Sequence, residues 1–112
     1  MGRLPTHLLT SALIRRVGDA GGHATVLARG DREGGTVLVL AAEKGTNLRF
    51  LERGLSPGGT PALVRCGPEP LESDGAATEY WQRRRGFDPD LWVIEVDVAA
   101  PERFIAETIL ND

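Results

Sequence analysis

The chain opens with apolar residues at helical spacing. Between residues 6 and 20 these positions recur at intervals of three and four, and they are Leu9, Ala12, Leu13 and Val17. Such spacing places one apolar stripe along a helix. Thr6 is a suitable N-cap, and Gly21 and Gly22 follow the stripe, where glycine readily takes the left-handed conformation that ends helices. The pattern predicts an amphipathic helix that packs on a flat surface.

Three strand-like segments follow this helix. Residues 24–29 are short and mixed, residues 36–42 (TVLVLAA) are apolar throughout, and residues 47–53 alternate. A strand that is apolar on both faces is typical of the middle of a sheet that is covered on both sides. Because polar turns at residues 30–35 and 43–46 join the three segments, we expect them to form an antiparallel meander.

The second half of the chain begins with a short strand and a second helix. Residues 62–66 resume the strand pattern after a turn rich in glycine and proline. Ser73 or Asp74 is suited to cap a helix, and Gly86 is suited to end it. We therefore expect a second helix between these residues.

Residues 91–98 form the most regular strand pattern in the chain. The apolar positions that share one face are Trp92, Ile94, Val96 and Val98. Glu95 and Asp97 face the other way, so we expect one core face and one face that is wet or held against a partner. Beyond Pro101 the apolar residues are compatible with a short last helix.

Together these elements predict a single α+β domain over residues 1–112, with a four- to five-stranded, mainly antiparallel sheet packed against two helices. The formal net charge of -3 is too small to argue for a nucleic-acid or membrane partner. Cys66 is the only cysteine, so no intrachain disulfide can form, and we expect a cytoplasmic location.

Three blocks of the sequence resemble a known family. They are Ser11-Ala12-Leu13-Ile14-Arg15-Arg16, then Arg29-Gly30-Asp31 with a glycine turn and Val37-Leu38-Val39, and then Phe87-Asp88-Pro89-Asp90-Leu91-Trp92-Val93-Ile94-Glu95. In this order they resemble the alphaproteobacterial proteins grouped as domain of unknown function 1491. The resemblance covers nearly the whole chain, and the last block is its most specific part. It implies a bacterial, cytoplasmic, single-domain protein, and it brings no activity, cofactor or catalytic residue.

The catalytic and metal motifs that the sequence suggests fail on physical grounds. Residues 54–58 match the G-x-S-x-G nucleophile elbow, but Pro57 follows the serine and has no N–H group for an oxyanion hole, so we expect a turn. His7, His23 and Cys66 lack the short spacings of zinc ligands. Neither a histidine nor a lysine is adjacent to Cys66 to lower its pKa, so we expect a buried, inert thiol. We predict no catalytic residue, no metal and no cofactor.

Residues 80–90 gather aromatic, basic and acidic side chains. The hypothesis of a ligand- or partner-binding surface depends on five of them: Trp81, Arg84, Arg85, Asp88 and Asp90. Guanidinium groups beside an aromatic ring suit a phosphate, a carboxylate or a stacked base, and two carboxylates could act as acid and base or hold a cation. The alternative is structural, because arginines in a last helical turn complement the helix dipole and Asp-Pro opens turns. The sequence favours the structural interpretation and leaves the other open.

No nucleophile, base or metal set is assembled in the sequence, which favours a non-enzymatic binding or assembly module acting through protein–protein contacts. Its expected partner is a protein, and a second copy of the chain is a candidate, since a small domain can cover an edge strand by pairing with itself. The alternative is a small anionic-ligand-binding protein or weak enzyme that uses the Arg83–Asp90 segment.

Overall fold

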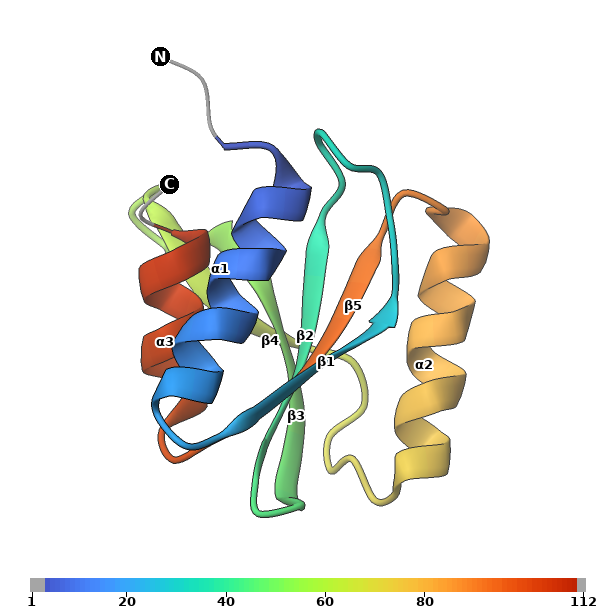
Figure 1. Cartoon of the computed structure of the whole chain (residues 1–112). Coiled ribbons are helices and arrows are strands. Elements are labelled where there is room, and N and C mark those ends of the chain that lie inside the picture. Colours follow the sequence, from blue (N-terminus) through green and yellow to red (C-terminus); the bar gives the residue numbers. More distant parts are fainter. Residues whose placement is uncertain (1–3, 111–112) are drawn as a thin grey trace.

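One five-stranded sheet lies between two layers of helices (Figure 1). The computed structural model describes residues 4–110. The elements in chain order are α1 (Thr6–Asp19), β1 (His23–Ala28), β2 (Val37–Glu43), β3 (Thr46–Leu55), β4 (Pro61–Cys66), α2 (Asp74–Phe87), β5 (Trp92–Asp97) and α3 (Pro101–Ile109). Helices α1 and α3 cover one face of the sheet and α2 covers the other. The α+β class and the mainly antiparallel sheet are confirmed, with three helices where two were predicted.

Strand β5 lies between β1 and β2, although it is the last strand in the chain. The strand order is β1-β5-β2-β3-β4. β5 runs parallel to β2 and antiparallel to β1, while β2, β3 and β4 follow one another as an antiparallel meander. The predicted meander is therefore wrong at its first step, because β1 pairs with β5 and not with β2.

The central position of β5 follows from its two apolar faces. Trp92 and Ile94 are buried against α1 and α3, whereas Leu91 and Val93 are buried on the α2 face. The expectation that this second face would be wet or held against a partner is wrong for the first part of the strand. Only the two acidic residues near its end are partly exposed. A strand that buries side chains on both faces belongs in the interior of a sheet.

Strand β2 confirms the prediction of a covered central strand. All residues from Val37 to Ala42 are buried. The parallel register sets Val39 beside Ile94 and Leu38 beside Val93, so each face of the two strands contributes to one continuous core. The larger core lies under α1 and α3, and the smaller core lies under α2.

Helix α1 ends as predicted but begins differently. Gly21 has a φ of 85°, and the Gly22 N–H donates to the Val17 carbonyl at 2.9 Å, which closes the last turn. At the other end Thr6 is the first helical residue and not the N-cap. Its hydroxyl donates to the Gly35 carbonyl at 3.0 Å, so it ties the helix to the loop before β2.

The other two helices begin with recognisable signals. Ser73 is the N-cap of α2, as predicted, because its Oγ accepts the Ala76 N–H at 3.1 Å. Helix α3 begins with Pro101, whose fixed φ suits a first helical position, and Ile105 and Ile109 bury one of its faces. None of the helices within residues 4–110 combines the length and apolar character needed to cross a membrane.

The loop between β1 and β2 lies directly on the start of β5. The Asp31 N–H donates to the Asp90 carbonyl at 3.0 Å, and the Trp92 indole N–H donates to the Asp31 carbonyl at 2.7 Å. The backbone at Gly30 is so close that a Cβ there would overlap the Asp90 carbonyl oxygen. This contact between two main chains, which we call the loop–strand junction, requires glycine at position 30.

Replacing Gly30 by alanine should therefore destabilise the protein by about 2–3 kcal/mol, because the new methyl group has to displace backbone atoms. Gly18 provides the matched control, since a Cβ in that position of α1 would meet nothing within 4 Å. Gly18→Ala should be neutral or stabilise by up to about 1 kcal/mol through helix propensity. Urea denaturation of both variants measures the two effects, and equal stability of Gly30→Ala and wild type would contradict the required close approach.

Candidate functional site

The first two residues of the predicted binding surface support α2 rather than face solvent together. Trp81 is partly buried against the core under α2. Arg84 donates to Glu52 on β3 at 2.8 Å and to the Tyr80 hydroxyl at 3.1 Å. The hydrogen bonds to Glu52 raise the pKa of Arg84 above its usual range. Arg84 therefore clamps the helix to the sheet.

The other three residues close the turn between α2 and β5. Arg85 donates to the carbonyl of Leu91 at 3.1 Å and to the carbonyls of Arg29 and Pro89, both at 3.0 Å. Asp88 accepts the Asp90 N–H at 3.1 Å through its carboxylate, and the Asp90 carbonyl accepts the Asp31 N–H. These residues lie close together, but the contacts described here are to the main chain of the loop–strand junction.

The structure thus brings Arg85, Asp88 and Asp90 together and leaves Trp81 and Arg84 to other contacts. None of the hollows discussed below is lined by any of the five. Their contacts match the structural interpretation of the segment, and a binding role for them stays a prediction.

Arg85→Ala should lower the free energy of unfolding by about 1.5–3 kcal/mol, because three carbonyls, one of them in a partly buried bond, lose a charged donor. Arg83→Ala is the matched control: it removes an exposed arginine from the same helical turn and should change stability by less than about 0.5 kcal/mol. Thermal or urea denaturation of the two variants decides the matter. Equal stability of the two variants would show that the contacts of Arg85 are not structural.

Cys66 lies at the end of β4, beneath α2, and is a poor nucleophile. Burial raises the pKa of its thiol to about 11, and the nearby Glu52 carboxylate adds to the rise. The thiolate is the reactive form, so almost none is present near neutral pH. The expectation of an inert thiol agrees with this environment.

Alkylation of Cys66 by iodoacetamide should follow this pKa. In the folded protein the rate should rise with a midpoint near pH 11, against about 9.0 for an ordinary cysteine, because the folded state favours the protonated thiol. The same chain unfolded in urea, followed by mass spectrometry, supplies the reference. A folded-state midpoint below that of the unfolded chain would mean that the site stabilises the thiolate.

The G-x-S-x-G match lies in a turn. The Ser56 hydroxyl lies 2.8 Å from the Thr60 hydroxyl, and the Ser56 N–H donates to the Thr60 carbonyl at 2.8 Å, which makes residues 56–60 a hairpin turn as predicted. Within residues 4–110 no three His, Cys, Asp or Glu side chains gather closely enough to hold a metal ion.

Sequence reasoning missed an open groove between α3 and β4. It encloses about 610 Å³ beside the edge of the sheet. The groove is lined by Asn47, Arg49, Leu51, Pro61, Ala62, Leu63, Arg65, Glu102, Ala106 and Leu110. Leu51 comes from β3 and Leu63 from β4, while Ala106 belongs to α3 and Leu110 is the C-cap of that helix. Most of this surface is therefore apolar, with charged groups at one end.

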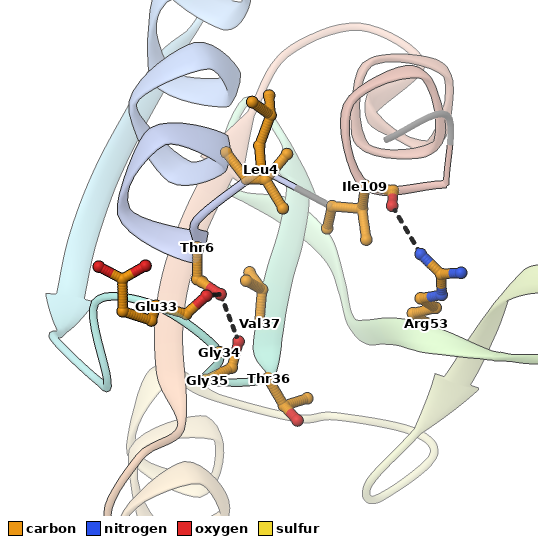
Figure 2. A pocket seen from close by; sticks show the side chains of 10 residues that line it. Leu4, Thr6, Glu33, Gly34, Gly35, Thr36, Val37, Arg53 and Ile109 are labelled. Atoms are coloured by element: carbon orange, nitrogen blue, oxygen red, sulfur yellow. Dashed lines mark hydrogen bonds between the residues drawn. The ribbon is translucent and has the colours of Figure 1, made fainter. Parts of the chain in front are cut away.

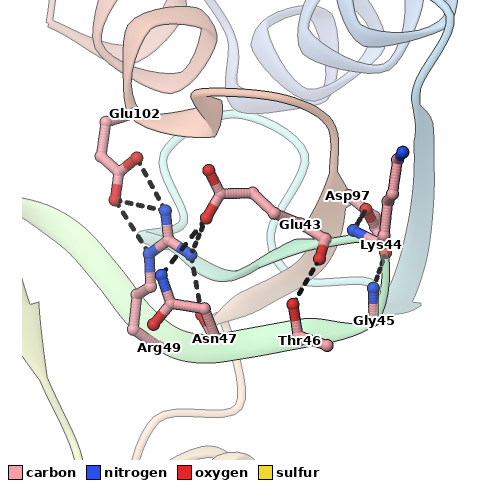
Figure 3. A network of polar contacts seen from close by, with 8 residues as sticks. All are labelled: Glu43, Lys44, Gly45, Thr46, Asn47, Arg49, Asp97 and Glu102. Carbon is pink, nitrogen blue, oxygen red and sulfur yellow. Dashed lines mark hydrogen bonds and ion pairs between the residues drawn. The ribbon is translucent and has the colours of Figure 1, made fainter.

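A buried arginine forms the charged end of the groove (Figure 3). Arg49 is only 4% exposed and donates to both carboxylate oxygens of Glu102, at 2.9 and 2.8 Å. It also donates to Glu43 at 3.0 Å and to the Asn47 carbonyl at 2.7 Å. Hydrogen bonds from Asn47 and Arg49 hold the pKa of Glu43 below its usual range. The cluster ties the first turn of α3 to β3, so the wall of the groove is fixed in place.

A smaller and more enclosed pocket lies between the start of α1 and the end of α3 (Figure 2). Its volume is about 310 Å³. The alternation of residues 47–53 predicted that Arg49 and Arg53 share one face of the strand. It did not show that Arg49 would be enclosed by carboxylates while Arg53 would line a pocket, because those neighbours come from distant parts of the chain.

Comparison with known proteins identifies the family. The model of the family described as "Protein of unknown function (DUF1491)" matches residues 4–106. The chain belongs to this family. The resemblance seen in the sequence is thereby confirmed, and the blocks around residues 29–31 and 87–95 prove to be the two sides of the loop–strand junction. No curated protein matches this chain.

Solved structures of similar proteins share the fold. The crystal structure of a DUF1491 family protein from Caulobacter crescentus CB15 is 30% identical, with a TM-score of 0.74 over 91% of this chain and 94% of that one. An NMR structure of a DUF1491 family protein from Caulobacter crescentus CB15 gives 30% identity and 0.72 over 92% and 94%. The solution structure of protein Atu0922 from A. tumefaciens is 27% identical, with a TM-score of 0.65 over 87% of each chain. The names of these three proteins state no activity.

Proposed function

We propose that this protein is a non-enzymatic binding module of the bacterial cytoplasm that receives an extended segment of a partner protein along β4. The observation that carries the proposal is the uncovered edge of β4 beside a largely apolar groove. Unpaired strand edges attract further strands unless they are blocked, and strand addition is a common mode of peptide recognition.

The backbone of β4 is arranged to accept another strand. The Ser56 N–H bonds the Thr60 carbonyl, and the register then pairs Gly54 with Ala62. Since bonded and non-bonded pairs alternate in an antiparallel ladder, the N–H and C=O groups of Leu63 and Arg65 point away from β3. These groups supply the hydrogen bonds that a partner strand needs.

The first residue of β4 suits the same edge position. Pro61 also directs its backbone outward by this alternation, and it has no N–H group to leave unpaired. A partner strand would therefore find donors from residue 63 onward and a carbonyl at residue 61. Pro61 thus limits how far pairing extends toward the hairpin turn.

Side chains beside β4 favour an apolar partner residue. Leu63 is partly buried and packs against the edge of the core under α1 and α3. Ala106 of α3 and the C-cap residue Leu110 line the same groove, so side chains on one face of an added strand would enter it. Burial of apolar area contributes roughly 25 cal/mol per Å², which adds affinity to the main-chain bonds.

A second copy of the chain is one partner that this edge would accept. A twofold axis through the β4 edges would set the two Leu63 residues opposite one another and Arg65 opposite Pro61 of the other copy. This is the form that the predicted homodimer would take. No contact of the Arg83–Asp90 segment described above favours the alternative of an anionic-ligand site there.

Photo-crosslinking tests the proposal. A benzophenone amino acid in place of Arg65, which is 56% exposed on β4, should give defined protein adducts in living cells, whereas the same group in place of Arg83 on α2 should not. Leu63→Lys should suppress the adducts by about tenfold or more, because it places a charge against the apolar contact. Mass spectrometry identifies the adduct, and a mass twice 12.1 kDa identifies a second copy.

Leu55→Lys is the control for a lysine introduced on the same hairpin. Leu55 is already 68% exposed at the end of β3, and it lies outside the groove. The adducts should survive this change. Absence of adducts from position 65, or adducts that Leu63→Lys leaves intact, would refute binding at β4.

A further inference from the structure

The geometry points to a second binding site, in which the enclosed pocket between α1 and α3 takes a small carboxylate with a short apolar body and Arg53 holds the charge. The pocket and the β4 groove share no lining residue. This inference is therefore independent of the proposed protein partner.

The pocket has the size and shape of a small-molecule site. Its volume of about 310 Å³ lies at the lower end of the range typical of ligand pockets. A single water molecule occupies about 30 Å³ in the liquid, so the space exceeds what one or two ordered waters fill. The lining residues are Leu4, Thr6, Leu9, Glu33, Gly34, Gly35, Thr36, Val37, Arg53 and Ile109.

Its walls combine apolar side chains with one cation. Figure 2 shows Leu4, Val37 and Ile109 around the space between the two helices, with Arg53 beside the end of α3. The Thr6 hydroxyl is occupied, because it donates to the Gly35 carbonyl at 3.0 Å. Glu33 lies at the rim, and its carboxylate points away from the other labelled side chains. The pocket thus offers apolar walls and one positively charged group.

Arg53 differs from the other arginines that hold the sheet and helices together. Arg49 and Arg84 each have a carboxylate at 2.8 Å. For Arg53, by contrast, no carboxylate of residues 4–110 lies within ion-pair distance, and its one described bond goes from Nη1 to the Ile109 carbonyl at 3.2 Å. A partly buried guanidinium without a carboxylate is suited to bind an anion from solution.

Capping of α3 accounts for part of the role of Arg53. The last turn of this helix carries no basic residue of its own, and Arg53 supplies a donor to its terminal carbonyl. This contact uses one of the five N–H groups of the guanidinium. The others remain able to donate two parallel hydrogen bonds to a carboxylate, while the apolar walls receive an aliphatic chain.

A carboxylate series with its neutral counterparts tests the inference. Acetate, isovalerate, hexanoate and octanoate are titrated into the isotope-labelled protein, and amide shifts are followed by NMR. At least one of the longer acids should bind more tightly than acetate and should shift the amides of Gly34 to Val37. The matching carboxamide should bind about tenfold more weakly or worse, because it lacks the charge that Arg53 recognises.

Two arginine variants distinguish recognition of the acid by Arg53 from a general effect of the protein's positive charge. Arg53→Gln should weaken the bound acid by about tenfold or more, whereas Arg65→Gln on the neighbouring strand should change its affinity by less than about twofold. Because Arg65 lines the β4 groove, this control also separates the acid site from the partner edge. If Arg53→Gln does not fold, the comparison of acid with amide in the wild-type protein decides the matter alone.

Two results would overturn the site. One is a series in which no acid shifts the amides of Gly34 to Val37. The other is equal affinity for an acid and its carboxamide, since the pocket would then be a hydrophobic hollow in which Arg53 only caps α3.

Discussion

The burial of β5 on both faces is the constraint on which the rest of the structure depends. Trp92 belongs to the core under α1 and α3, and its neighbour Leu91 belongs to the core under α2, so one strand joins the two layers. Its first residues are held by the loop–strand junction, where Gly30 lets two main chains meet. The bonds of Arg85 to three carbonyls serve the same junction. Arg85, Asp88 and Asp90, which suggested a binding surface in the sequence, thereby help to fix the start of β5.

Local patterns predicted the elements well and their neighbours poorly. The uniform apolar run of β2 identified a central strand, and the serine before α2 identified a helix start, because both signals depend only on nearby residues. Strand order depends on pairing between distant segments, and the sequence around β1 does not specify β5 as its partner. The second apolar face of β5 was the available clue. Leu91 and Val93 carry it, and the acidic residues that follow obscured it.

The candidate sites show the same limit at the level of single side chains. Arg49 and Arg53 are one residue type, on one strand and one face, four positions apart. Glu102, 53 residues away along the chain, neutralises the first, whereas the second donates to a carbonyl at the end of α3. Sequence spacing cannot reveal which arginine has a carboxylate, because the partner comes from another element. The groove beside β4 likewise exists only because the fold brings this edge strand next to α3.

The strand order also has a consequence for how the protein is made. Residues 92–97 lie inside the sheet, so β1 has no strand to pair with until this segment has left the ribosome. The earlier segments can assemble the β2-β3-β4 hairpins, while α1 and β1 wait for the carboxyl-terminal part. Pairing across such sequence separations slows folding. Completion of the sheet is thus a late event in the folding of this domain.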